Sequence, residues 1–181
     1  MRRAALALVL AAGCGSSPKP AEGPPVGISH HDGTAGDRPA LSDKAVAFAF
    51  DSLDERAVSS ESMAGKVSVL AFVTTGSIDA QAQLGYLVAM HAHDGAKVNY
   101  AAVALHPRRE MTLVDALART VRAPFPFALG DAATLSGPAS PFGEIAAVPT
   151  TVVLDPGGRL VWKRTGLAKA DEIRAHMPRG R

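Results

Sequence analysis

The sequence predicts an α/β fold with three layers, in which helices flank a central mixed sheet of about five strands. Short apolar runs alternate with amphipathic helical patterns through the middle of the chain. Two further strands then surround a glycine-rich turn, and a final helix follows them. Hydrophobic residues make up 47% of the 181 residues and charged residues 20%, which is sufficient for one buried core.

The first 42 residues are expected to lie outside this fold. Residues 1–13 combine a basic start, an apolar run and small residues before Cys14, which is the order of a secretory signal peptide. The apolar run is too short to span a membrane. Residues 14–42 are rich in Pro, Gly and Ser and have no hydrophobic period, so they are expected to form a flexible tether.

The segment Leu-Ala-Ala-Gly-Cys that ends at Cys14 resembles the bacterial lipobox. This resemblance implies cleavage before Cys14, acylation of its thiol, and anchoring to a membrane that faces the periplasm. Gly15 rather than aspartate follows the cysteine, which favours the outer membrane over the inner one. The alternative is an ordinary signal peptide with an incidental cysteine.

The charge balance gives no reason to expect a nucleic-acid partner. The formal net charge is +2, from 19 basic and 17 acidic side chains. Removal of Arg2 and Arg3 with the signal peptide leaves equal numbers of the two signs. Nucleic-acid binding proteins present a basic surface to the phosphates, and this composition does not predict one.

The folded domain is expected over residues 43–177, followed by a basic tail at 178–181. Its first strand is predicted at residues 46–50, with residues 57–59 as a hairpin partner. Residues 67–74 read VSVLAFVT, a continuous apolar run that is typical of a buried strand. A helix is predicted at residues 77–93, because apolar and aromatic side chains recur on one helical face. These residues are Leu84, Leu87, Val88 and His91.

The middle of the domain repeats the alternation of a strand with a helix. Residues 98–105 read VNYAAVAL and predict the next strand. An amphipathic helix is predicted at residues 113–121. Its apolar face consists of Leu113, Ala116, Leu117, Thr120 and Val121. Residues 125–129 then form a short extended piece after Pro124.

The end of the domain is predicted to be a hairpin and a helix. Residues 150–154 and 160–163 flank the sequence Asp-Pro-Gly-Gly-Arg, in which glycine allows the positive φ that a tight turn needs. Residues 170–177 form the last helix. A right-handed β-α-β unit followed by a β-hairpin and a helix is the plan expected for the whole domain.

Several segments resemble one known superfamily in both order and spacing. Residues 48–58 (FAFDSLDERAV) resemble the motif F-x-L-x-x-L-D-G-R-x-V, and residues 64–67 (AGKV) resemble L-K-G-K-V. Residues 69–75 (VLAFVTT) follow V-L-V-N-F-W-A-T. Residues 148–151 (VPTT) correspond to a cis-proline segment, and residues 154–161 (LDPGGRLV) to I-D-x-x-G-R-I-V.

On these motifs the chain resembles the thioredoxin-like superfamily, most closely its membrane-anchored thiol oxidoreductase and redoxin branch, which includes alkyl hydroperoxide reductase and thiol-specific antioxidant proteins. Redox-active members carry Trp-Cys-x-x-Cys where the central strand meets the helix. Aligned on Phe72, this chain has Ser77 at the first cysteine position and Ala80 at the second. Thiol–disulfide exchange needs a thiolate and a resolving thiol. Cys14, the only cysteine, lies in the tether, so we predict no catalytic residues and no cofactor.

Two interpretations of the altered junction remain. In the first, Ser77 is the N-cap of the helix and Asp79 interacts with the positive end of its dipole. In the second, Thr74, Thr75, Ser77 and Asp79 line a polar pocket that faces Pro149 and binds a ligand.

The resemblance implies a cis peptide at Val148–Pro149, which leaves the backbone of Val148 free to pair with an extended peptide. The proline is then either required by the turn alone or part of a surviving peptide-docking groove.

The histidines raise the hypothesis of a metal carrier, because copper chaperones share this fold. His91 and His93 point about 200° apart on a helix and do not share a metal there. His91 is expected to pack on the apolar face and His93 to be exposed. His30 and His31 lie in the tether. We predict no metal site.

The leading hypothesis is a lipid-anchored, redox-inactive binding or assembly module in the cell envelope, with an extended peptide or a protein as its partner at the Pro149 groove. A thiol oxidoreductase or antioxidant enzyme is the first alternative, and a histidine-based copper carrier is the second.

Overall fold

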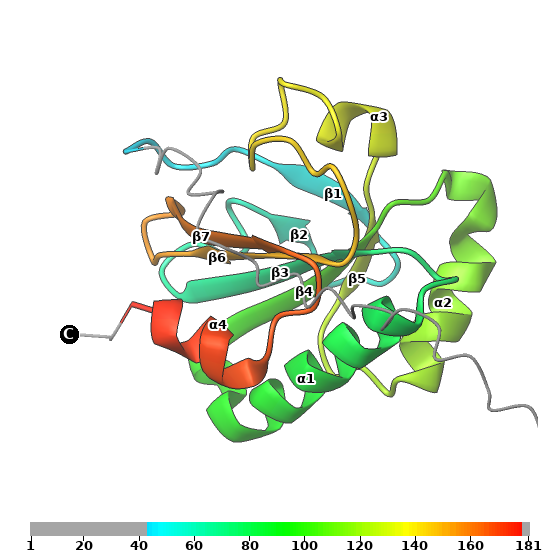
Figure 1. The fold of residues 1–181 in the computed structure, drawn as a ribbon, viewed down its shortest axis with the longest axis horizontal. Helices are drawn as coiled ribbons and strands as arrows, with labels where there is room; N and C mark the ends of the chain where they lie inside the picture. Colours follow the sequence, from blue (N-terminus) through cyan, green and yellow to red (C-terminus); the bar gives the residue numbers. More distant parts are fainter. Residues whose placement is uncertain (1–42, 179–181) are drawn as a thin grey trace, which may run out of the picture. The chain divides into compact units, whose positions relative to one another are not determined.

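The computed structural model describes residues 43–178, so the predicted signal peptide, Cys14 and the whole tether lie outside the described residues. A mixed sheet runs through this region in the strand order β2-β1-β5-β4-β3-β6-β7 (Figure 1). Its strands are β1 (Ala49–Ser52), β2 (Val58–Ser59), β3 (Val67–Val73), β4 (Val98–Ala104), β5 (Phe127–Leu129), β6 (Thr150–Leu154) and β7 (Leu160–Thr165). The α-helices are α1 (Ile78–Asp94), α2 (Met111–Thr120), α3 (Ala132–Leu135) and α4 (Ala170–His176). Two 3₁₀ turns, η1 (Gly95–Lys97) and η2 (Arg108–Glu110), precede β4 and α2.

The α/β class with a central mixed sheet between helices is confirmed, but the prediction of about five strands is wrong, because the sheet has seven. The sheet is larger than predicted because the shortest strands also pair within it. β5 lies between β1 and β4, antiparallel to the first and parallel to the second. A run of two to four residues carries too little periodicity to show whether it joins a sheet.

Helices cover one face of the sheet. α1, α2 and α4 contribute to a core cluster in which Leu84, Leu87 and Met90 have no exposed surface. Gln83 is equally buried and holds the loop before α4. Its side-chain amide donates to the Ala168 carbonyl at 3.1 Å, and its carbonyl oxygen accepts from the Ala168 N–H at 2.7 Å.

Short segments cover the other face. Figure 1 shows α3 and the segment that leads into β1 on this side, opposite α1 and α4. Its core is aromatic: Phe142 is fully buried and lies 5.1 Å from Phe72, 5.2 Å from Phe48 and 6.1 Å from Phe50, measured between ring centroids. Phe48 and Phe50 are only half-buried.

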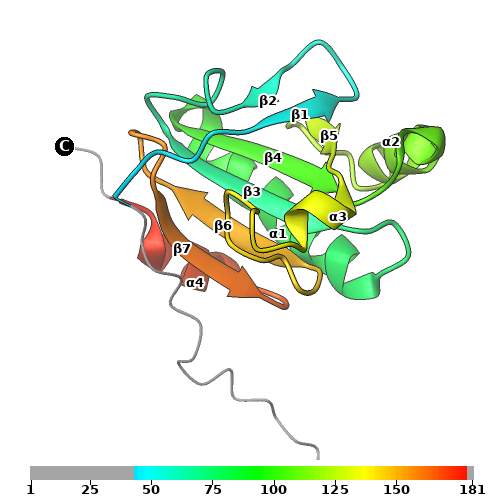
Figure 2. The ribbon, with the colours of Figure 1, turned by 90° about the horizontal axis from the view of Figure 1, so that it is seen from above.

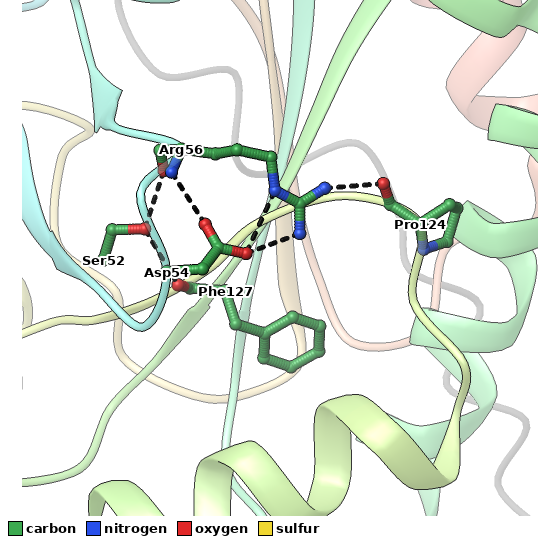
Figure 3. Close-up of polar contacts among 5 residues, drawn as sticks. All are labelled: Ser52, Asp54, Arg56, Pro124 and Phe127. Atoms are coloured by element: carbon green, nitrogen blue, oxygen red, sulfur yellow. Dashed lines mark hydrogen bonds and ion pairs between the residues drawn. The ribbon is translucent and has the colours of Figure 1, made fainter.

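The loop between β1 and β2 is held by Arg56 (Figure 3). The Arg56 guanidinium donates to the Asp54 carboxylate at 2.6 and 3.0 Å and to the Pro124 carbonyl at 2.8 Å. The hydrogen bond from this guanidinium is the main cause that lowers the pKa of Asp54. These contacts place the loop against the segment that enters β5.

The β6–β7 turn is organised by Asp155. Its carboxylate accepts from the Arg159 backbone N–H at 2.9 Å and from the Arg159 Nε at 2.7 Å. Gly158 adopts φ +79°, so the predicted positive-φ glycine is present in the turn. Burial raises the pKa of the Asp155 carboxyl, but the hydrogen bonds from Arg159 outweigh it and hold the pKa below its usual value.

Most predicted elements agree with the structure within a few residues. The first strand is the exception, because it begins at Ala49 rather than at residue 46. Helix α3 was not predicted, since its four residues are too few for a helical pattern. None of the helices within residues 43–178 is long and apolar enough to cross a bilayer.

Candidate functional site

The junction between β3 and α1 is the place where redox-active relatives of this fold carry their cysteines. Ser77 caps α1: its side-chain oxygen accepts from the Ala80 N–H at 3.2 Å, which confirms the predicted cap. Asp79 lies in the first turn of the helix and is exposed. Ala80 is fully buried. Ser77 and Ala80, the two positions predicted to align with the redox cysteines, are therefore joined by the hydrogen bond of the helix cap.

Pro149 lies beside this junction. The Val148–Pro149 peptide is cis, as predicted. Phe72 near the end of β3 pairs with Thr150, the residue that follows the proline. Pro149 is buried and its carbonyl accepts from the Gly166 N–H at 2.7 Å, whereas Val148 is half-buried. Of the two residues, Val148 presents more surface at this edge.

Ile78 provides the apolar surface of the junction. It is the first residue of α1, between Ser77 and Asp79, and it is 83% exposed. Burial of such a large aliphatic side chain against another molecule would be favourable, because it removes apolar surface from water.

Thr75, one of the residues predicted to line a polar pocket, contacts a residue that was not considered. The Thr75 N–H donates to Nε2 of His106 at 3.0 Å, and its Oγ1 lies 3.3 Å from the same nitrogen. Nδ1 of His106 lies 2.8 Å from the Glu110 carboxylate. Thr75, His106 and Glu110 thus form a chain of hydrogen bonds that sequence reasoning missed.

The geometry of this chain determines what it can do. Nε2 of His106 accepts from a backbone N–H, and Nδ1 lies within hydrogen-bond distance of the Glu110 carboxylate. The carboxylate orients the imidazole as in a hydrolytic triad. However, the lone pair that a general base needs is occupied by the Thr75 N–H. His106 therefore acts here as a strap that holds the loop after β3.

The sequence did contain a signal for this contact. β3 and β4 are parallel neighbours, so their carboxyl ends meet at one edge, where Thr75 and His106 follow them. Glu110 lies four residues after His106, a spacing that suits a local pair. Only His30, His31, His91 and His93 were considered as metal ligands.

His91 and His93 have the environments that were predicted. His91 packs against Tyr100 and Phe125, with ring centroids 5.8 and 6.2 Å apart. The His93 side chain is 78% exposed and pairs with Asp94 at 2.9 Å. Among residues 43–178 no three His, Cys, Asp or Glu side chains form a group that could hold a metal ion. His30 and His31 lie outside these residues.

The mixed sheet between helices, with a cis proline before β6, has the architecture of the thioredoxin-like fold. No family profile matches the sequence, and no curated protein sequence matches it. Solved structures do match. A DsbF homologue from Corynebacterium diphtheriae superposes with a TM-score of 0.64 at 16% identity, over 81% of this chain and 94% of that one.

Two other structures give the same result. A putative thiol:disulfide interchange protein DsbE from Chlorobium tepidum has a TM-score of 0.60 at 22% identity, over 75% of this chain and 92% of that one. A secreted Mycobacterium tuberculosis disulfide oxidoreductase homologous to E. coli DsbE has a TM-score of 0.58 at 16% identity, over 75% of this chain and 97% of that one. At these identities the likeness shows the fold.

Proposed function

We propose that this chain is a non-catalytic binding module of the cell envelope, lipid-anchored through Cys14, that holds an extended peptide or protein partner at the Ser77–Pro149 edge. The observation that carries the proposal is the pair Ser77 and Ala80, joined by a capping hydrogen bond where related folds exchange disulfides. A hydroxyl and a methyl group do not form a disulfide.

The surface of the junction supports a binding role. Ile78 and Val148 offer apolar surface at the edge where β3 ends and β6 begins. A partner that buries the Ile78 side chain gains about 2 kcal/mol from the hydrophobic effect. The strap through Thr75 and His106 holds the loop in place before any partner arrives.

The location rests on the sequence and on the similar structures. The lipobox-like segment at Cys14 supports acylation, and one similar structure is that of a secreted disulfide oxidoreductase. The proposed membrane faces the periplasm, and Gly15 favours the outer one.

A disulfide-reduction assay tests the absence of thiol chemistry. The chain and its Cys14→Ser variant are compared with a Ser77→Cys/Ala80→Cys double variant, which restores a dithiol at the start of α1. We expect the first two to show the same background rate and the double variant to reduce the substrate. Turnover by the chain above that of Cys14→Ser would restore the oxidoreductase hypothesis.

Crosslinking and capture from membranes tests the binding role. We expect Ile78→Asp to lower the yield of a specific crosslinked partner at least tenfold, since it places a charge in the apolar contact. Leu113→Asp is the matched control, because Leu113 on α2 is also exposed, at 55%. Equal loss with both variants, or no loss with either, would contradict binding at this edge.

A further inference from the structure

We propose a second docking surface, on the opposite side of β1 from β2, which binds an extended, apolar peptide segment of another protein that carries a basic residue. This surface is separate from the Ser77–Pro149 edge and does not depend on the function proposed for that edge. Three observations carry it: an open strand edge, an apolar cavity beside that edge, and a negative charge at the cavity.

The strand edge is open because β5 is shorter than the segment beside it. β5 ends at Leu129, which pairs with Asp51, and the chain then turns into α3. Ala49 lies opposite Ser59 of β2, between the positions at which Phe48 and Phe50 bond to that strand. Its own N–H and C=O therefore point away from β2. Within residues 43–178 no strand lies beside Ala49 on that side.

A cavity of about 880 Å³ borders this edge, the largest of the cavities described in this region. It is lined by the segment Ala47–Asp51, by residues 105–108, by residues 129–135 and by Pro141. Figure 2 shows β1 and α3, which together contribute seven of the lining residues. Its volume is within the range of binding pockets and its wall includes Phe48, Leu105 and Leu135.

The charged residues of the lining indicate which kind of peptide the cavity would bind. Arg108 pairs with Asp51, which neutralises that carboxylate. Asp131 accepts hydrogen bonds from the hydroxyl and the N–H of Thr134, and these bonds lower its pKa, so it is ionised at neutral pH. Asp131 therefore gives the cavity a negative charge. A basic residue in the occupant complements it.

A strand that adds to this edge satisfies all three features. Its main chain pairs with Ala49, alternate side chains enter the cavity, and a lysine or arginine reaches Asp131. Peptide recognition by strand addition has this division of roles, in which main-chain bonds provide affinity and pockets for alternate side chains provide specificity.

The test uses the ¹⁵N-labelled full-length chain and a capped hexapeptide that alternates valine and threonine and begins with lysine. We expect amide shifts at Ala49 and at residues 129–135. A peptide N-methylated on alternate amides and a peptide with glutamate in place of lysine are the controls, and both are expected to bind at least fivefold more weakly.

Two variants test the contacts on the protein. Asp131→Asn preserves a good helix cap and is expected to weaken binding of the lysine peptide about fivefold, with no loss for the glutamate peptide. Ala49→Pro removes the edge N–H and is expected to abolish binding. Asp115→Asn on α2 is the charge control.

Four outcomes would overturn the proposal. The first is equal binding of the N-methylated peptide, which would make the cavity a site for an apolar ligand without strand pairing. The second is a set of shifts confined to the region around Ile78. The third is equal binding by Asp131→Asn and the unchanged chain. The fourth is a change in the same amides with protein concentration alone, which would assign the surface to a second copy of this chain.

Discussion

The two faces of the sheet differ in how completely they are covered. On the helical face, α1 alone contributes Leu84, Leu87 and Met90, all without exposed surface, and Gln83 ties the helix to the loop before α4. On the other face, a four-residue helix and loops cover an aromatic cluster and leave a cavity of about 880 Å³ beside β1. Long helices seal a sheet face, whereas short segments leave strand edge and apolar surface available to a partner.

The largest expected effect is on the free energy of unfolding, when one core residue from each face is truncated. Leu87→Ala is expected to lower the free energy of unfolding by about 2–5 kcal/mol, because a fully buried side chain leaves a cavity. Phe48→Ala removes a larger side chain but is expected to cost less, since Phe48 is half-buried beside an existing cavity. Denaturant unfolding measures both. An equal or larger loss for Phe48→Ala would show that the loop-covered face is as closed as the helical one.

The second prediction concerns the polar clamp of the helical face. Gln83→Ala is expected to lower the free energy of unfolding by about 2–3 kcal/mol, because it leaves the Ala168 N–H and C=O without their partner. Gln81→Ala, an exposed change on the same helix, is the control and is expected to stay within about 0.5 kcal/mol. Equal effects would mean that the buried amide contributes no more than an exposed one.

The third prediction concerns Asp155, whose turn supports the segment that leads into β1. The Val46 N–H donates to the Gly158 carbonyl at 2.8 Å, so this turn also positions the loop-covered face. Asp155→Asn is expected to cost about 1–2 kcal/mol at neutral pH, because the carboxylate accepts charge-assisted bonds from Arg159.

This effect depends on pH with a definite sign. The pKa of Asp155 is lowered in the folded chain, so its stabilisation is complete above the pKa of about 3.9 in the unfolded chain and is lost as pH falls through the folded value. The free energies of unfolding of the chain and of Asp155→Asn are measured at several pH values from 7 to 3, and their difference gives the contribution of the carboxylate. A difference that grows toward low pH would contradict this account. Asp115→Asn is the control, at an exposed ion pair with Arg119.

The smallest effect is expected at the Ser77 cap of α1. Ser77→Ala is expected to lower the free energy of unfolding by about 1 kcal/mol, and Ser77→Gly by only a few tenths. Thermal unfolding of the two variants distinguishes them. If Ser77→Ala has no effect, the hydroxyl is not required for the cap, and a role for it in ligand binding becomes the better explanation.

Much of the fold and part of the site were predictable from local patterns. The apolar runs at β3 and β4 and the glycine turn between β6 and β7 were recognised because each pattern is contained within a few neighbouring residues. The same holds for the Ser77 cap, which involves only a residue three positions away. β5 was recognised as extended, but its place between β1 and β4 was not, because a three-residue strand does not indicate its neighbours.

The sequence by itself determined the chain order of the strands and of the three longest helices, the capped start of α1, and the absence of cysteine from positions 77 and 80. These properties depend on residue identity and on neighbours within one or two turns. Only the tertiary structure decided that His106 meets Thr75 across 31 residues, and that β1 and α3 leave a cavity between them. Both depend on strand register and on where short segments end, and those are set by packing between distant parts of the chain.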